Sequence, residues 1–179
     1  MYKCFVFLAV FLCFQQDSKG VAWKENFKLN WQDFKAKPDK STEAVAITAS
    51  GITFGYSVQR SSTRGVIGFK SEVFAHFYPE HSWYKKESVD NHVLAHEQLH
   101  FDITELHARY FREKLSKLEV NSNITEVLNT LHNQTNTSLA DMQNKYDTES
   151  NYSMDNEGQV KWSTFVAKEL KRLQKFKVD

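Results

Sequence analysis

Apolar residues recur with two different periods along the chain, and the period changes near residue 88. From Ile52 to Val58, apolar residues alternate with small or polar ones, which is the spacing of a β-strand with one buried face. The run from Val66 to Tyr78 has apolar residues at both alternate sets of positions, so we expect a strand covered on two sides. The first half of the chain is therefore predicted to form a β-sheet.

Between Ser88 and Lys117 the apolar residues have helical spacing instead, and neither proline nor glycine interrupts them. Ser88 or Asp90 can cap the start of this predicted helix, which contains the motif His96-Glu97-x-x-His100. Residues four apart lie on the same face of a helix, so both imidazoles can bind one zinc ion at roughly 2.0–2.1 Å. Glu97 lies on a neighbouring sector and can accept a proton from a zinc-activated water. The alternative is a pair of surface histidines on an amphipathic helix.

Two further helices are predicted after this one. Approximate helical spacing continues from Ile124 to Tyr146, although weak helix formers at residues 133–138 favour a bend or a break. Asp155 or Asn156 can cap a last helix, whose end is basic. Strands followed by helices indicate an α+β fold with one core.

The N-terminal segment has the pattern of a signal peptide. Residues 4–14 form an unbroken apolar run that is too short for an ordinary membrane span, and small residues just before Val21 permit cleavage there. We therefore predict a signal peptide at residues 1–20 and a single domain at residues 21–179. The mature protein is expected to be exported to the periplasm or the exterior, with no stable insertion in a membrane. An uncleaved N-terminal anchor is the alternative.

Cysteine and charge content exclude several classes of function. Both cysteines, Cys4 and Cys13, lie in the predicted signal peptide, so the mature chain has no disulfide, cysteine nucleophile or thiolate ligand. The whole chain has 23 basic and 22 acidic residues, and removal of residues 1–20 makes the two numbers equal. Such a balance does not indicate nucleic acid or an anionic membrane surface as a partner.

Four stretches carry a resemblance to a known family. They are Leu29–Pro38, Phe74–Trp83, His96–Glu105 and Tyr146–Glu149, with Gln159 and Trp162 beyond them. They resemble a bacterial family of domains of unknown function that are predicted to be secreted zinc-dependent proteases. The resemblance implies a small zincin-like domain, in which an N-terminal sheet precedes the metal-binding helix and two more helices. It also implies zinc as cofactor, a polypeptide substrate, and Val66–Tyr78 as an edge strand that pairs with extended peptide.

At Tyr152 the chain departs from this family, which has a histidine there. A catalytic zinc commonly has three protein ligands and a water. If the family's histidine is the third ligand, tyrosine has replaced it here, either as a phenolate ligand or as a hydroxyl that stabilises the transition state. Asp147, Glu149 and His132 are alternative third ligands, and the sequence does not choose among the four.

Other polar residues of the predicted metal helix are given supporting roles. Along the helix axis His92 lies about 12 Å from His100, and His107 lies about 16 Å from His96, so neither is expected to join His96 and His100 as the third ligand on a straight helix. Asp102 and Glu105 can orient the imidazoles through their N–H groups, or they are surface carboxylates.

From these observations we expect an exported zinc metallopeptidase in which Glu97 is the general base. The alternative from a different class is a catalytically inactive zincin that binds a peptide or protein in the same cleft. A purely structural zinc site is disfavoured, because it normally has four protein ligands and gives Glu97 no role. The sequence does not specify an oligomeric state, the natural substrate or the cleavage preference.

Overall fold

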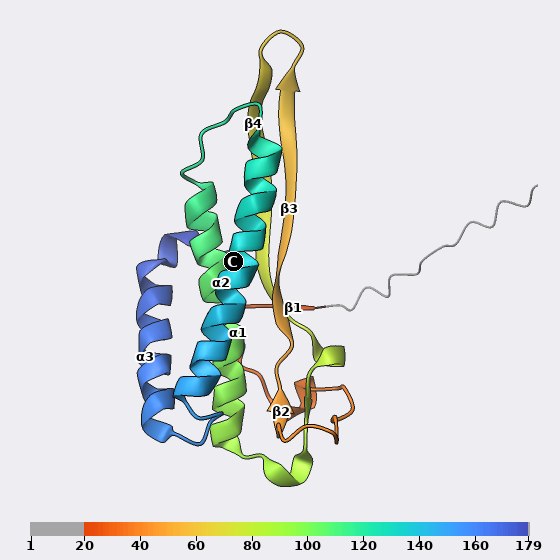
Figure 1. Ribbon diagram of the computed structural model, residues 1–179, viewed down its shortest axis with the longest axis vertical. Helices are drawn as coiled ribbons and strands as arrows, with labels where there is room; N and C mark the ends of the chain where they lie inside the picture. Colours follow the sequence, from red (N-terminus) through yellow and green to blue (C-terminus); the bar gives the residue numbers. More distant parts are fainter. Residues whose placement is uncertain (1–19, 179) are drawn as a thin grey trace, which may run out of the picture.

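The computed structural model describes residues 20–178, in which a long β-hairpin packs beside three helices (Figure 1). The elements are β1 (Val21–Ala22), β2 (Ala46–Ile47), β3 (Ser50–Ser61), β4 (Gly65–Phe77), β5 (Trp83–Tyr84), α1 (Asn91–Leu115), α2 (Ile124–Glu149) and α3 (Asn156–Arg172), with short 3-10 helices η1 (Trp31–Asp33), η2 (Pro79–His81), η3 (Lys86–Ser88) and η4 (Gln174–Phe176). The predicted α+β class is confirmed. Apart from its last residue, the predicted signal peptide lies outside the described residues.

The main sheet has the strand order β1-β4-β3. Strands β3 and β4 pair antiparallel along the whole hairpin, and the turn between them ends at Gly65, whose φ of 71° favours glycine. Strand β1 pairs with β4 only at Phe77 and His76. The expectation that Val66–Tyr78 is an edge strand is therefore wrong at its C-terminal end, because β1 covers it there. Strands β2 and β5 form a separate two-stranded sheet.

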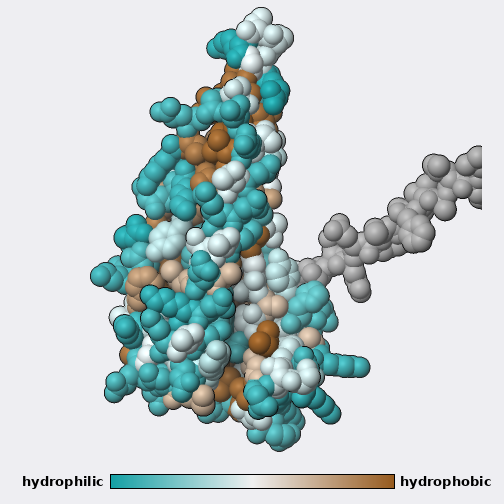
Figure 2. Space-filling model, in the orientation of Figure 1, coloured by the Kyte–Doolittle hydropathy of each residue, from teal (hydrophilic) through white to brown (hydrophobic). Residues whose placement is uncertain are grey.

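The surface is mostly hydrophilic, and hydrophobic residues are scattered toward the tapering end formed by the hairpin (Figure 2). Ile67 of β4 and Val120 of the α1–α2 connection are examples of exposed apolar side chains. Singly exposed apolar residues are normal on soluble domains. Among the described residues, no helix is long and apolar enough to span a bilayer.

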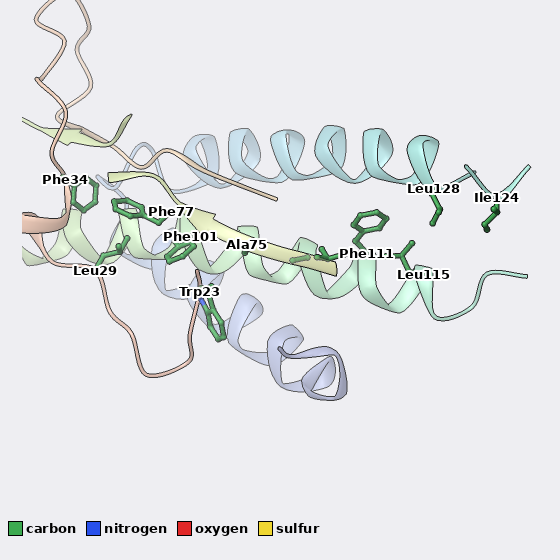
Figure 3. Close-up of a cluster of buried hydrophobic side chains, with 12 residues drawn as sticks. Trp23, Leu29, Phe34, Ala75, Phe77, Phe101, Phe111, Leu115, Ile124 and Leu128 are labelled. Carbon is green, nitrogen blue, oxygen red and sulfur yellow. The ribbon is translucent and has the colours of Figure 1, made fainter. Parts of the chain in front are cut away.

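One hydrophobic cluster joins the hairpin to α1. Alternate residues of β4, among them Ala75 and Phe77, face α1, where Phe77 lies 5.9 Å from Phe101 between ring centroids. Figure 3 shows this cluster extending along α1, from Leu29 and Phe34 at one end to Leu115, Ile124 and Leu128 at the other. This packing fixes which face of α1 is turned away from the sheet.

The opposite face of α1 packs against α2 and α3. A second cluster contains Leu99, Ile103, Leu106, Leu139, Tyr146, Trp162, Val166 and Leu173. Helix α2 continues through residues 133–138, where a break was possible, and buried Thr135 donates a hydrogen bond to the carbonyl of Leu131 at 2.7 Å. The buried hydroxyl of Thr135 therefore has a hydrogen-bond partner within the helix itself, and α2 stays helical as far as Glu149.

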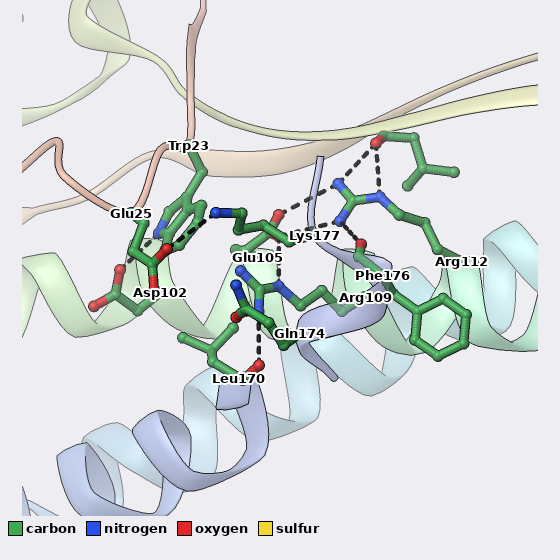
Figure 4. Close-up of polar contacts among 11 residues, drawn as sticks. Trp23, Glu25, Asp102, Glu105, Arg109, Arg112, Leu170, Gln174, Phe176 and Lys177 are labelled. Carbon is green, nitrogen blue, oxygen red and sulfur yellow. Dashed lines mark hydrogen bonds and ion pairs between the residues drawn. The ribbon is translucent and has the colours of Figure 1, made fainter. Parts of the chain in front are cut away.

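A buried ionic network lies on the C-terminal half of α1 (Figure 4). Arg109 donates to Glu105 at 2.8 Å and to the carbonyl of Leu170 at 2.6 Å. Arg112 also donates to Glu105, at 3.1 Å, and it reaches the carbonyl of Val73 in β4 at 2.8 Å. The network therefore ties the sheet and α3 to the same stretch of α1.

Candidate metal centre

Helix α1 places the two motif histidines on one face. Its start is fixed by Asp90, whose carboxylate accepts hydrogen bonds from the backbone N–H groups of His92 and Val93, as the sequence predicted for Ser88 or Asp90. His96 and His100 follow one turn apart, and their Nε2 atoms lie 3.1 Å from each other. Both rings are directed to the same point beside the helix.

Helix α2 brings a carboxylate to this point. Asp147 Oδ1 lies 3.1 Å from His96 Nε2 and 2.9 Å from His100 Nε2. Ligand atoms of tetrahedral zinc, bound at roughly 2.0–2.1 Å, are about 3.3 Å apart. The three atoms thus fit the ligand triangle of a zinc ion closely, and they form the group suited to a metal among the described residues.

The electrostatics of this group favour a bound cation. Burial raises the pKa of Asp147, but hydrogen bonds from His100 and His96 outweigh it, so the pKa lies well below its usual value. Burial lowers the pKa of His100, but the hydrogen bond to Asp147 and the charge of Glu97 raise it above its usual value. The Asp147 carboxylate is therefore ionised at neutral pH. Its Oδ1 and the Nε2 atoms of His96 and His100 all have lone pairs directed at one another unless a proton or a metal ion lies between them.

Glu97 lies next to this group, with its side chain largely buried. Its Oε2 has no hydrogen-bond partner among the described residues. Its charge raises the pKa of His100 and, after the larger effect of burial, that of Tyr146. The backbone carbonyl of Glu97 accepts a hydrogen bond from the Thr48 hydroxyl at 3.2 Å, which ties the segment between β2 and β3 to the motif. A buried carboxylate without a partner is costly, so this arrangement is typical of a functional group.

Tyr146 forms the wall of the centre and was not identified from the sequence as a site residue. Its fully buried ring stacks on His96, with centroids 4.5 Å apart. Neither the Tyr146 hydroxyl nor His96 Nδ1 has a hydrogen-bond partner among the described residues. Its position directly before Asp147 on α2 explains the contact. The stacked ring holds the imidazole plane of His96 in place.

Tyr152, predicted as a possible ligand or transition-state stabiliser, lies in the turn after α2, five residues beyond Asp147. Its side chain is 65% exposed, and it lies in a turn where Asn151, Tyr152 and Ser153 all have positive φ. Its backbone N–H donates to the carbonyl of Asp147 at 2.8 Å. The turn therefore closes directly behind Asp147, while the phenol is largely in solvent.

The other two alternatives for the third ligand also lie elsewhere. The Glu149 carboxylate accepts a hydrogen bond from Trp162 Nε1 at 2.9 Å. His132 packs against Phe54 and Phe111 near the hairpin. Of the four candidates, the structure places Asp147 with the two histidines.

The carboxylates expected to orient the imidazoles have different partners. Asp102 accepts hydrogen bonds from Trp23 Nε1 at 2.7 Å and Gln98 Nε2 at 2.9 Å, and Glu105 belongs to the arginine network. The residue that contacts His100 Nδ1 is Gln143, through its Oε1. Gln143 was missed, although its place four residues before Asp147 on a helix was a signal that both share one face.

The remaining histidines of α1 have structural contacts. His92 Nε2 lies 2.6 Å from the carbonyl of Ser153 and so joins the start of α1 to the turn after α2. His107 is buried with its Nε2 3.4 Å from Met142 Sδ, and burial lowers its pKa to about 4. His107 takes no part in the centre because it lies about 16 Å from His96 along the axis of α1.

Comparison with known proteins gives one match. Residues 80–158 match a family described as bacterial protein of unknown function (DUF922). No curated protein and no solved structure matches the chain. The match covers less than half of the 179 residues, but it includes His96, Glu97, His100 and Asp147. The matched stretch therefore contains the whole candidate centre.

Proposed function

We propose that the protein is a zinc-dependent peptidase in which Glu97 is the general base. The observation that carries this proposal is the meeting of His96, His100 and Asp147 beside the buried, unpartnered carboxylate of Glu97. Three protein ligands leave one zinc position open, which distinguishes catalytic zinc sites from closed structural ones.

The donor set suits zinc. Two imidazoles and one carboxylate are common ligands of catalytic zinc, although iron(II) enzymes use the same set. Glu97 favours hydrolysis between these two chemistries, because a general base next to the metal has a direct role there. When bound, zinc would polarise the scissile carbonyl and make a water molecule more acidic.

The chain itself supplies the proton transfers. Glu97 accepts the proton of the attacking water and later passes it to the leaving amine, and its Oε2 has no other hydrogen-bond partner in the described part of the chain. Asp147 balances the charge of the cation, and Tyr146 keeps the His96 ring fixed by stacking. The substrate is a polypeptide, and the predicted signal peptide at residues 1–20 places the reaction outside the cytoplasm.

The first experiment measures bound metal. Elemental analysis of the purified wild type should give about one zinc per chain. His96→Ala should lose it, because a third of the ligand set is removed. His81→Ala is the matched control, since His81 is an exposed histidine of η2 outside the group. Equal zinc in wild type and His96→Ala would contradict the assignment of the site.

The second experiment measures hydrolysis of a mixed peptide library, with cleavage products identified by mass spectrometry. Cleavage that depends on zinc and is restored by zinc after chelation is expected. A wild type that holds zinc and binds peptides without cleaving them would instead support the inactive, peptide-binding alternative. Full activity restored by iron(II) alone would contradict zinc as the cofactor.

A further inference from the structure

We propose that Gln143 is a positioning residue that keeps a proton on His100 Nδ1, so that His100 Nε2 presents its lone pair to the metal. This inference deepens the proposed function, because it states how one ligand of that same centre is prepared. Gln143 lies on α2 one turn before Asp147, so one helix would supply both a ligand and the group that orients another ligand.

The side-chain amide of Gln143 lies between three polar atoms of α1. Its Oε1 is against His100 Nδ1. Its Nε2 lies 3.0 Å from the backbone carbonyl of His100 and 3.3 Å from the hydroxyl of Thr104. All the contacts of this amide are therefore made to the histidine that it orients or to the residue one turn beyond it.

These contacts fix which way the amide points. A backbone carbonyl can only accept a hydrogen bond, so the end of Gln143 that faces the carbonyl of His100 must be the NH₂ group. If the amide were flipped, two carbonyl oxygens would face each other about 3 Å apart, a repulsive contact. The carbonyl oxygen of Gln143 is consequently the atom that faces His100 Nδ1.

Thr104 supports the same orientation. It is fully buried, and its hydroxyl donates its single proton to the carbonyl of His100 at 3.1 Å. The Thr104 oxygen can then accept from Gln143 Nε2 and from the Ser50 hydroxyl, which lies 2.7 Å away at the start of β3. The amide is thus anchored by a chain of hydrogen bonds that extends to the sheet.

An amide oxygen that faces Nδ1 requires a proton on Nδ1. Metal binding leaves a neutral imidazole one proton, so this contact retains that proton on Nδ1 and leaves Nε2 as the ligand atom. His100 Nε2 is the atom that lies 2.9 Å from Asp147 and 3.1 Å from His96 Nε2. Within residues 20–178, His96 has no such partner at Nδ1 and is held by stacking on Tyr146 instead. Gln143 therefore acts on one ligand selectively.

The direct test is nitrogen NMR of ¹⁵N-histidine-labelled protein, both metal-free and zinc-loaded. In the wild type, a protonated Nδ1 of His100 with slow exchange is expected in both forms. Gln143→Met keeps the length of the side chain but removes the acceptor, so the Nδ1 proton should exchange rapidly. Gln143→Ala removes the whole amide and should lose the slow proton as well. Gln134→Leu, at an exposed position of the same helix, is the control.

Zinc affinity provides the second readout. Removal of a group that orients a metal-ligating histidine typically costs 10–100-fold in affinity, so a loss of about that size is expected for Gln143→Met and little loss for Gln134→Leu. An unprotonated Nδ1 in the wild type would overturn the inference. So would a Gln143→Met protein with the wild-type Nδ1 signal and zinc affinity.

The two readouts separate this inference from the proposed function. A slow Nδ1 proton in a wild type that binds no zinc would support the positioning role of Gln143 and contradict the peptidase. Zinc-dependent cleavage with no effect of Gln143→Met on the Nδ1 proton would support the peptidase and contradict the positioning role of Gln143. If Gln143→Met fails to fold, the wild type and Gln143→Ala still decide the inference, since the wild type must show the slow Nδ1 proton and Gln143→Ala must lose it.

Discussion

Two polar clusters lie along α1, and they differ in whether their buried groups are satisfied. In the C-terminal half, Glu105 is paired with two arginines, and the arginines also reach backbone carbonyls. In the N-terminal half, His96 Nδ1 and Glu97 Oε2 are buried without a partner among the described residues, as is the hydroxyl of Tyr146, whose ring stacks on His96. Each unsatisfied group costs about 1–3 kcal/mol.

The difference separates a stabilising cluster from a functional one. The described part of the chain has four buried side-chain atoms without a partner, and three of them belong to the candidate centre. The arginine network is complete with protein atoms alone and needs no ligand. The centre, by contrast, becomes electrostatically complete only with a cation between its histidines and Asp147, which is why we interpret it as a binding site.

The largest expected effect is on catalysis, in Glu97→Gln. This change keeps the size of the side chain but removes the proton acceptor, so kcat should fall by about 10²–10⁴. Zinc content and Tm should stay at the wild-type values or Tm should rise, because an unpartnered buried charge is removed. Glu126→Gln, on the exposed face of α2, is the control. A lower Tm with unchanged turnover would show that Glu97 has a structural role.

The next effect is on stability, in Arg109→Met. Removing one partner of a buried ion pair leaves the other charge without compensation, so the free energy of unfolding should fall by about 3–5 kcal/mol in urea titrations. Arg172→Met breaks an exposed pair with Glu169 and should cost less than about 1 kcal/mol. Folded Arg109→Met should still bind zinc. Loss of zinc from the folded variant would mean that the two clusters are not independent.

A smaller effect concerns pH and His107, a buried histidine between the two clusters. Its pKa of about 4 lies below the ordinary value of 6.5, so the unfolded chain binds a proton before the folded one does. The contribution is fully present above pH 6.5 and is lost as pH falls toward 4, up to about 3 kcal/mol. Urea midpoints measured across this range should show the loss, and His107→Gln should reduce it. An unchanged pH profile in that variant would contradict the assignment.

The smallest effect is expected for Tyr152→Phe. Because Tyr152 is mostly exposed, zinc affinity should match the wild type. Asp147→Asn provides the contrast, since it removes the ligand charge and should weaken zinc binding clearly. Competition titration with a zinc chelator measures both. Weaker zinc binding in Tyr152→Phe would contradict this expectation and show that Tyr152 contributes to the metal site.

The sequence predicted those parts that depend on local periodicity. The helix between Ser88 and Lys117, its cap at Asp90 and the shared face of His96 and His100 all follow from spacing within a few turns. The choice of Asp147 did not follow, because it depends on α2 packing beside α1 across 51 residues of sequence. Once α2 is known to continue to Glu149, Asp147 is directed to the centre.

The sheet shows the same limit. The strands β3 and β4 were predicted from the spacing of their apolar residues, but the expectation that the second is an edge strand failed at its C-terminal end. Strand β1 consists of Val21 and Ala22 alone and is too short to carry a periodic pattern. Its pairing with β4 depends on the aromatic core around Phe77 and on Trp23, whose N–H donates to the carbonyl of Ala75.

The turn after α2 has a consequence for the rate at which a metal ion enters and leaves. Three consecutive residues, Asn151, Tyr152 and Ser153, have left-handed backbone conformations without a glycine among them. Such residues store about 1–3 kcal/mol each, which is released when the turn opens. Opening would detach the hydrogen bond between the Tyr152 N–H and the carbonyl of Asp147 and loosen the carboxylate. The rate of metal exchange at the proposed centre is therefore expected to change in parallel with the rate of hydrogen exchange at the Tyr152 amide.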